Sequence, residues 1–300
     1  MSAPENRTAE TAEAQRTEPV RPPRRPILPQ VRLYLGALLI LVWGLAPFYW
    51  MVITALRDKA YVYSTNPLPT HVTLDNFKDA LSTHAGNDFL SAIVNSVLIG
   101  AVTTAIAITA GIFTAYALAR IDFRGKFAVT GLILAASMFP GVALVTPLFQ
   151  LFTNIGWMGT YQALIIPNVS FALPLTIYTL TSFFNDLPWE LEEAARVDGA
   201  TRSQAFLKII FPLAAPAIFT TAILAFILTW NEFMLSSQLS TRATEPVTVA
   251  IARFAGDNPY MPPHSAIMAA GALVTVPLVV MVLIFQRRIV SGLTAGGLKS

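Results

Sequence analysis

The sequence has 300 residues, of which 54% are hydrophobic and 12% are charged, with a formal net charge of +3 and no cysteine. Because about a quarter of the residues in a soluble domain are charged, this composition excludes most soluble folds. The lack of cysteine excludes disulfides and thiolate metal sites.

Six apolar segments are long enough to cross a membrane. A span needs about 20 mostly apolar residues to cross a hydrocarbon layer of ~30 Å, and its backbone must satisfy its own hydrogen bonds in lipid. The sequence therefore predicts an all-α, polytopic membrane protein with six transmembrane helices. These are expected near 33–56, 89–119, 127–152, 161–184, 213–235 and 265–286.

The basic residues predict the orientation. With both termini in the cytoplasm, fifteen of the twenty Lys and Arg residues face inward, as the positive-inside rule requires. The five on the outer side are Arg57, Lys59, Lys78, Arg242 and Arg253. The positive charge therefore indicates a multi-pass protein of the cell membrane, in contact with lipid, and not one that binds nucleic acid.

The chain begins with a polar segment over 1–30 that is rich in proline, glutamate, threonine and arginine. Such a composition predicts a disordered cytoplasmic tail. The apolar run after Arg24-Arg25 is too long for the 7–15-residue core of an export signal. We therefore expect a six-helix transmembrane domain over 31–290 and a short cytoplasmic tail over 291–300.

The first outer loop, 57–88, contains the sequence 73-TLDNFKDAL-81, whose apolar residues have near-helical spacing. Two interpretations of this short helix stay open: it lies on the lipid surface, or it contacts an outside partner. The histidines lie in or beside outer loops, and no two of them have the i, i+4 spacing of a helical metal site. They are His71, His84 and His264. We expect no metal site.

Prolines are predicted to break spans three and four, because each removes a backbone donor. They are Pro140, which precedes Gly141, then Pro147, Pro167 and Pro174. Polar side chains lie nearby: Gln150, Asn168, Ser170, Thr176 and Tyr178. These either hydrogen-bond across helix interfaces or line a translocation path.

Span five is predicted to end in 230-WNEF-233, which places the acidic Glu232 within a span. A charge in the membrane is costly and usually faces a cavity or a partner. Glu232 therefore either extends to the nearby membrane surface or faces the translocation path together with Trp230 and Asn231. Asn168 is a further candidate for this path.

The terminal stretch 292-GLTAGGLKS-300 partly matches a phosphate-binding loop. In that motif lysine directly follows glycine, between a strand and a helix. Here Leu298 separates Gly297 from Lys299, and a membrane helix precedes the stretch. No pair of residues suggests catalysis either. We expect no catalytic residue and no cofactor in this chain, so a partner subunit would use any ATP and magnesium.

The loop over 185–212 is the most polar run in the second half of the chain, and the predicted topology places it in the cytoplasm. Pro188 suits the first turn of a helix, and acidic residues follow where they complement the helix dipole. Glu192 and Arg196 have the spacing of an ion pair. A glycine at 199 can adopt the positive φ that ends a helix.

A second short helix is predicted after Gly199, because Thr201 and Gln204 form a capping box. The sequence therefore predicts that the loop consists of a helix, a glycine turn and a second helix. An amphipathic helix lying on the bilayer would favour basic residues on its polar face, but the first helix is acidic. Ala194 and Ala195 also leave a flat patch, so the pattern favours a protein-docking surface.

This loop resembles that of the permeases of ABC importers. The stretch 193-EAARVDGATRSQAFLKIIFP-212 matches the pattern E-A-A-x3-G-x9-I-x-L-P except for Phe211, where leucine is usual. The fuller form 191-LEEAARVDGA-200, the stretch 230-WNEF-233 and the ending 286–300 resemble the carbohydrate-uptake branch. Within that branch, the similarity is to the second permease of maltose- and trehalose-type importers, and especially to actinobacterial trehalose permeases.

The resemblance implies the ABC importer permease fold and a role in taking up a sugar, such as trehalose or maltose. It implies that the loop couples the permease to a dimer of ATP-hydrolysing subunits through Glu193, Ala194, Ala195, Asp198 and Gly199. It also implies a homologous second permease and an extracytoplasmic sugar-binding protein as partners. The tail over 292–300 would reach the interface of the ATPase dimer.

Two other classes of protein remain as alternatives. An ion-coupled secondary transporter needs buried ionisable groups for its coupling ion, and only Glu232 is available for this role. A non-transporting membrane scaffold does not account for the broken helices with polar neighbours. Neither alternative explains all the features as well as a permease subunit.

Overall fold

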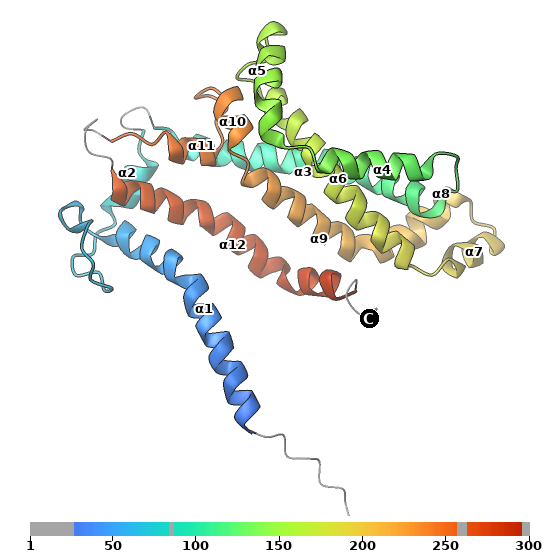
Figure 1. Cartoon of the computed structure of the whole chain (residues 1–300), viewed down its shortest axis with the longest axis horizontal. Coiled ribbons are helices and arrows are strands. Elements are labelled where there is room, and N and C mark those ends of the chain that lie inside the picture. Colours follow the sequence, from blue (N-terminus) through green and yellow to red (C-terminus); the bar gives the residue numbers. More distant parts are fainter. Residues whose placement is uncertain (1–26, 84–86, 257–262, 296–300) are drawn as a thin grey trace, which may run out of the picture. The chain divides into compact units, whose positions relative to one another are not determined.

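The structure is a computed structural model that describes residues 27–83, 87–256 and 263–295. Within these ranges the chain is helical apart from connecting loops and one isolated antiparallel bridge between Arg57 and Val72 (Figure 1). The predicted N-terminal tail over 1–30 lies outside the described residues up to residue 26, and the predicted C-terminal tail lies outside them from residue 296. The chain divides into two compact units, residues 1–49 and 50–300.

Within the described residues, five helices and one bent pair of helices are long and apolar enough to cross a membrane. The long helices are α1 (Ile27–Leu56), α3 (Phe89–Arg120), α6 (Tyr161–Asp186), α9 (Phe211–Trp230) and α12 (His264–Ala295). The bent pair is α4 (Lys126–Ser137) and α5 (Val145–Asn154), joined through the 3-10 helix η3 (Gly141–Leu144). Counted as one span, the pair completes the six predicted helices, and the all-α membrane fold is confirmed.

Short helices fill the connections between these spans. They are the 3-10 helix η1 (Lys59–Tyr61), α2 (Asp75–Leu81), α7 (Glu190–Val197), α8 (Arg202–Ala205), the π-helical segment η4 (Phe206–Ile210), α10 (Met234–Leu239) and α11 (Val247–Ala252). In the larger unit, α7 and α8 lie at the end of α3 opposite to α10 and α11 (Figure 1). Polar connections therefore gather at the two ends of an apolar bundle.

The break in the third predicted span falls where the sequence predicts it. Pro140 precedes η3, and the helical axes on either side differ in direction by 85°. The predicted break in the fourth span is wrong, because α6 runs continuously through Pro167 and Pro174. Both prolines are buried, and packing against neighbouring helices stabilises α6 although each proline removes a backbone hydrogen bond.

The core of the larger unit is formed by α3, which packs along α6 and α9. Small residues make this close approach possible. A Cβ atom at Gly111 would lie 2.4 Å from Cγ2 of Thr176, and one at Gly100 would lie 2.7 Å from the Phe226 ring. Because these distances are shorter than real contacts, α3 reaches its neighbours only with glycine at both positions.

The loop over 57–88 contains the predicted short helix, observed as α2, which packs against α12. Its Asn76 is fully buried, and the side-chain Nδ2 donates to the carbonyl oxygens of Ala55 at 2.8 Å and Arg57 at 2.6 Å. Both acceptors lie where α1 ends, so one amide group fixes α2 to that end. Leu74 and Leu81 are exposed.

We predict that Asn76→Ala destabilises the protein by about 1–3 kcal/mol, because two buried carbonyl groups lose their donor. Thermal unfolding of the purified protein would measure this change. Asn154→Ala, at the exposed end of α5, is the matched control and should leave the melting temperature unchanged. Equal melting temperatures for the Asn76 variant and the control would contradict this role.

Candidate functional site

The candidate site is the polar loop between α6 and α9, and it has the predicted helix, turn, helix structure. Glycine 199 has a φ of +89° directly after α7. Thr201 and Gln204 form the predicted capping box at the start of α8. From Arg202 the helical path then continues through η4 and α9 to Trp230 without a break. The loop is therefore joined directly to a membrane span.

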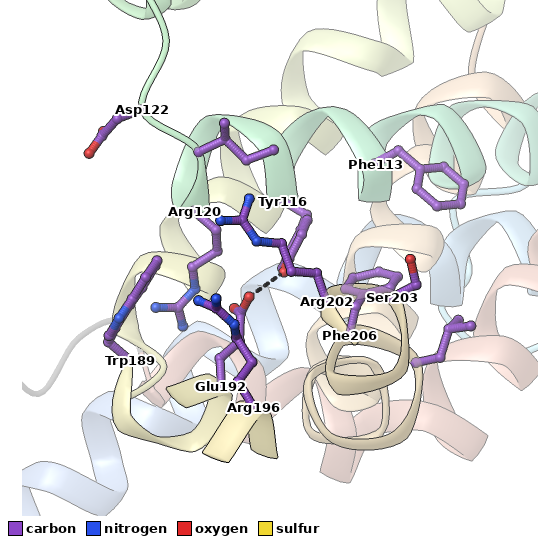
Figure 2. Close-up of a pocket in the computed structure, with 12 residues that line it drawn as sticks. Phe113, Tyr116, Arg120, Asp122, Trp189, Glu192, Arg196, Arg202, Ser203 and Phe206 are labelled. Carbon is purple, nitrogen blue, oxygen red and sulfur yellow. Dashed lines mark hydrogen bonds between the residues drawn. The ribbon is translucent and has the colours of Figure 1, made fainter. Parts of the chain in front are cut away.

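A buried carboxylate attaches the first loop helix to α3. Glu192 is only 6% exposed, and its Oε1 accepts a hydrogen bond of 2.9 Å from the Tyr116 hydroxyl (Figure 2). The ion pair that the spacing predicts between Glu192 and Arg196 is not formed within the described residues. The inward position of Glu192 instead lets it meet a donor from another helix.

A second attachment comes from the last residue of α3. Arg120 donates from Nη2 to the carbonyl oxygen of Leu187 at 2.8 Å. Its guanidinium carbon also lies 5.2 Å from the centre of the Trp189 ring, within the range of a cation–π contact. Arg120 therefore binds the chain on the α6 side of α7, while Tyr116 binds α7 itself.

Aromatic packing surrounds the Tyr116 hydrogen bond. The Tyr116 ring centre lies 4.6 Å from that of Phe206 and 5.9 Å from that of Phe184. The buried cluster here comprises Ile112, Ala115, Leu180, Phe184, Phe206, Ile210, Ala214 and Ile218. Side chains of α3, α6, η4 and α9 thus form one packed unit beneath the loop.

Four of the five predicted coupling residues lie on the exposed side of the loop, namely Glu193, Ala194, Asp198 and Gly199. Glu193 accepts a hydrogen bond of 2.9 Å from Nε1 of Trp189. Ala195 is only 5% exposed and packs inward, so the expected flat patch of two alanines has Ala194 alone on its surface. Val197 adds an apolar side chain that is 86% exposed.

A cavity of about 590 Å³ opens beside the loop (Figure 2). Three arginines line it, from α3, α7 and α8, together with aromatic and aliphatic side chains. The lining residues are Phe113, Tyr116, Arg120, Ile121, Asp122, Trp189, Glu192, Arg196, Arg202, Ser203, Phe206 and Leu207. The cavity therefore combines positive charge with an apolar wall.

The residues predicted to line a substrate path differ in how exposed they are and in what they contact. Asn168 is 1% exposed and donates to Leu164 of its own helix. Trp230 is 2% exposed and stacks on Phe226, with ring centres 5.6 Å apart. Asn231 is exposed and donates back to Ile227. These three side chains therefore differ in burial, and their role in a substrate path stays a prediction.

Glu232 lies beyond the end of α9 and not within a span, because that helix stops at Trp230. Its carboxylate accepts hydrogen bonds from the backbone amides of Leu235 at 2.7 Å and Ser236 at 3.0 Å, and from the Ser236 hydroxyl at 2.5 Å. These amides belong to the first turn of α10. The side chain thus satisfies donors at the start of that helix, an arrangement that neither interpretation from the sequence included.

The residues that attach the loop were not among the sequence candidates. Tyr116 and Arg120 lie in α3, far from the loop in sequence. The sequence gives one local indication of their role: a tyrosine and an arginine stand four residues apart at the end of an apolar span. The described residues contain no group of three His, Asp or Glu side chains that could hold a metal ion. His84 lies outside the described residues.

The fold of the apolar bundle matches that of a solved membrane transporter chain. A chain from the crystal structure of a bacterial ABC transporter involved in the import of the acidic polysaccharide alginate has the same fold, with a TM-score of 0.72 at 19% identity. The alignment covers 89% of this chain and 99% of that one.

This chain belongs to the family described as binding-protein-dependent transport system inner membrane component, whose model matches residues 107–294. It is 45% identical over 262 residues to the trehalose transport system permease protein SugB of Mycobacterium tuberculosis, covering 87% of this chain and 94% of that protein. It is 39% identical over 277 residues to the trehalose/maltose transport system permease protein MalG of Thermococcus litoralis, covering 92% and 99%.

The chain is therefore a non-catalytic permease subunit of an ATP-driven importer, and it resides in the cell membrane. ATP hydrolysis belongs to a partner subunit. Both relatives align over nearly their whole length, so the match includes the spans as well as the loop.

We predict that Tyr116→Phe loosens the loop, because it removes the one donor to the buried Glu192 carboxylate among the described residues. The cost should be about 1–3 kcal/mol, measured as faster amide hydrogen exchange over 189–199. Tyr178→Phe, which changes an exposed tyrosine of α6, is the control and should exchange like the wild type.

A double-mutant cycle with Glu192→Gln tests whether the two side chains act on each other. The two changes should be clearly non-additive, since either one alone already removes most of the interaction. Additive effects, or unchanged exchange in Tyr116→Phe, would show that the hydrogen bond does not hold the loop.

Proposed function

We propose that this chain is a permease subunit of a sugar importer that takes up a disaccharide of the trehalose or maltose type. The observation that carries the proposal is its 45% identity, over nearly the whole length of both chains, to a trehalose permease. A second relative, at 39% identity, is a trehalose/maltose permease from Thermococcus litoralis. Similarity to both supports the α-linked glucose disaccharides as the substrate class.

The proposed assembly contains four kinds of partner. A homologous second permease would complete the transport path, and a dimer of ATP-hydrolysing subunits would bind on the cytoplasmic side and use ATP with magnesium. An extracytoplasmic sugar-binding protein would deliver the substrate to the other side. Membrane lipid would surround the apolar helices. In this assembly the present chain binds no cofactor itself.

We infer that the loop over 185–212 couples this permease to the ATPase. Three observations support this role. The outer side of the loop exposes Glu193, Ala194, Asp198 and Gly199 without burying them in its own chain. Its inner side is fixed to α3 by the hydrogen bond of Glu192. Its second helix continues into α9, so a movement of the loop is carried into a membrane span.

The substrate class is tested by calorimetry on the cognate binding protein, identified by co-purification with the intact transporter. We expect it to bind trehalose, maltose or both, and we expect the reconstituted transporter to take up the same sugar only with ATP. Sucrose serves as a control disaccharide in which glucose is linked to fructose. Binding of neither trehalose nor maltose would overturn the proposed substrate class.

The coupling role is tested at Glu193. Glu193→Lys should abolish sugar-stimulated ATP hydrolysis more completely than Glu193→Ala, because it adds repulsion to the loss of a charge. Truncating one member of a buried charge pair at an interface costs about 2–5 kcal/mol. A compensating charge reversal in the ATPase groove should partly restore Glu193→Lys, while sugar capture by the binding protein stays normal. Wild-type hydrolysis and uptake in both variants would exclude the loop as a coupling element.

A further inference from the structure

The cavity beside the loop contains more positive charge than the protein itself neutralises. Arg120, Arg196 and Arg202 all line it, and Figure 2 shows their guanidinium groups directed into the space around Glu192. Among the described residues, the side chains of Arg196 and Arg202 form no ion pair and donate no hydrogen bond. Asp122 also lines the cavity, but it points away and pairs with Lys126 at 3.5 Å.

Two buried polar atoms in the cavity wall also lack partners. Oε2 of Glu192 accepts no hydrogen bond, although its residue is only 6% exposed, and Nε of Arg120 donates none. A buried polar atom without a partner is costly. The cavity therefore offers an unused acceptor beside unused donors, which is the arrangement expected for a ligand that carries both an anionic group and a hydroxyl.

The opposite wall of the cavity is apolar and exposed. Phe113 is 62% exposed and Leu207 is 61% exposed, and both line the cavity. Phe113 lies on α3, a helix long and apolar enough to cross a membrane, so the apolar wall is continuous with a candidate span. The cationic residues lie beyond it, toward the loop. Charge at one side and exposed apolar surface at the other fit an amphiphile and not a fully soluble anion.

We propose that this cavity binds an anionic phospholipid with a hydroxylated headgroup, such as phosphatidylglycerol. The phosphate would contact the guanidinium groups of Arg196 and Arg202, since basic pockets between membrane helices suit anionic headgroups. A headgroup hydroxyl would donate to Oε2 of Glu192. The acyl chains would lie along Phe113 and Leu207. This inference goes beyond the proposed function, because it concerns a lipid site and not the transported sugar.

Because of where the site lies, a bound lipid would affect how the loop is attached to α3. Glu192 would accept from Tyr116 through one oxygen and from the lipid through the other, and Arg196 belongs to the same helix, α7. The lipid would therefore stabilise the attachment of α7 to α3. Its binding can be measured directly, without ATP hydrolysis, so a failure of the coupling proposal would not affect this test.

The experiment is native mass spectrometry of the intact transporter, titrated with phosphatidylglycerol, phosphatidylmethanol or phosphatidylcholine. We expect phosphatidylglycerol to bind tightest. Phosphatidylmethanol, which has the same single negative charge but no headgroup hydroxyl, should bind more weakly, and phosphatidylcholine should bind weakest. Each arginine near an anionic lipid contributes about fivefold in affinity. The double change Arg196→Gln and Arg202→Gln should therefore weaken phosphatidylglycerol binding about 25-fold.

Matched variants distinguish lipid binding in the cavity from general attraction of lipid to surface charge. Arg124→Gln removes an exposed arginine just outside the cavity and should leave lipid binding unchanged, whereas Arg196→Lys keeps the charge and should keep most of the affinity. Co-purification of the partner subunits confirms that each variant is assembled. Equal binding of phosphatidylcholine, or an Arg124→Gln loss as large as that of the double variant, would overturn the proposal. Displacement of the lipid by glycerol 3-phosphate at equal concentration would also overturn it, by showing a site for a soluble anion.

Discussion

The hydrogen bond between Tyr116 and Glu192 is the interaction on which the functional end of the protein depends. It places a buried carboxylate beside aromatic side chains and arginines, where the Tyr116 hydroxyl is its hydrogen-bond donor. Because the donor belongs to α3 and the acceptor to α7, the loop keeps a fixed place beneath the bundle. The packing of Phe206 on Tyr116 extends that attachment to the helical run that becomes α9.

The local structure of the loop could be predicted from the sequence, because its signals act over a few residues. Acidic residues at the start of α7, the glycine at 199 and the pairing of Thr201 with Gln204 each fix backbone geometry by short-range contacts. The six apolar segments were predictable for a similar reason, since hydropathy depends on composition alone. The fold class followed from both kinds of signal.

Contacts between distant segments could not be predicted in this way. Spacing favoured Arg196 as the partner of Glu192, but the observed partner lies 76 residues away. Hydropathy included Glu232 in a span because it directly follows the apolar run that ends at Trp230. The backbone instead turns at Asn231, and the carboxylate accepts hydrogen bonds from the first amides of α10. In both cases an acid is satisfied by a donor whose position only the folded chain defines.

At the Gly199 turn, the backbone conformation disfavours an L-residue, although there is space for a larger side chain. An added Cβ would meet no atom within 4 Å, yet φ is +89°, a region that L-residues enter only at a cost. There is thus ample room for a methyl group, and only its stereochemistry is wrong. A mirror-image alanine would fit the turn without strain, whereas natural alanine would press α7 and α8 toward a different angle. The geometry of the exposed loop surface therefore depends on the achirality of one residue.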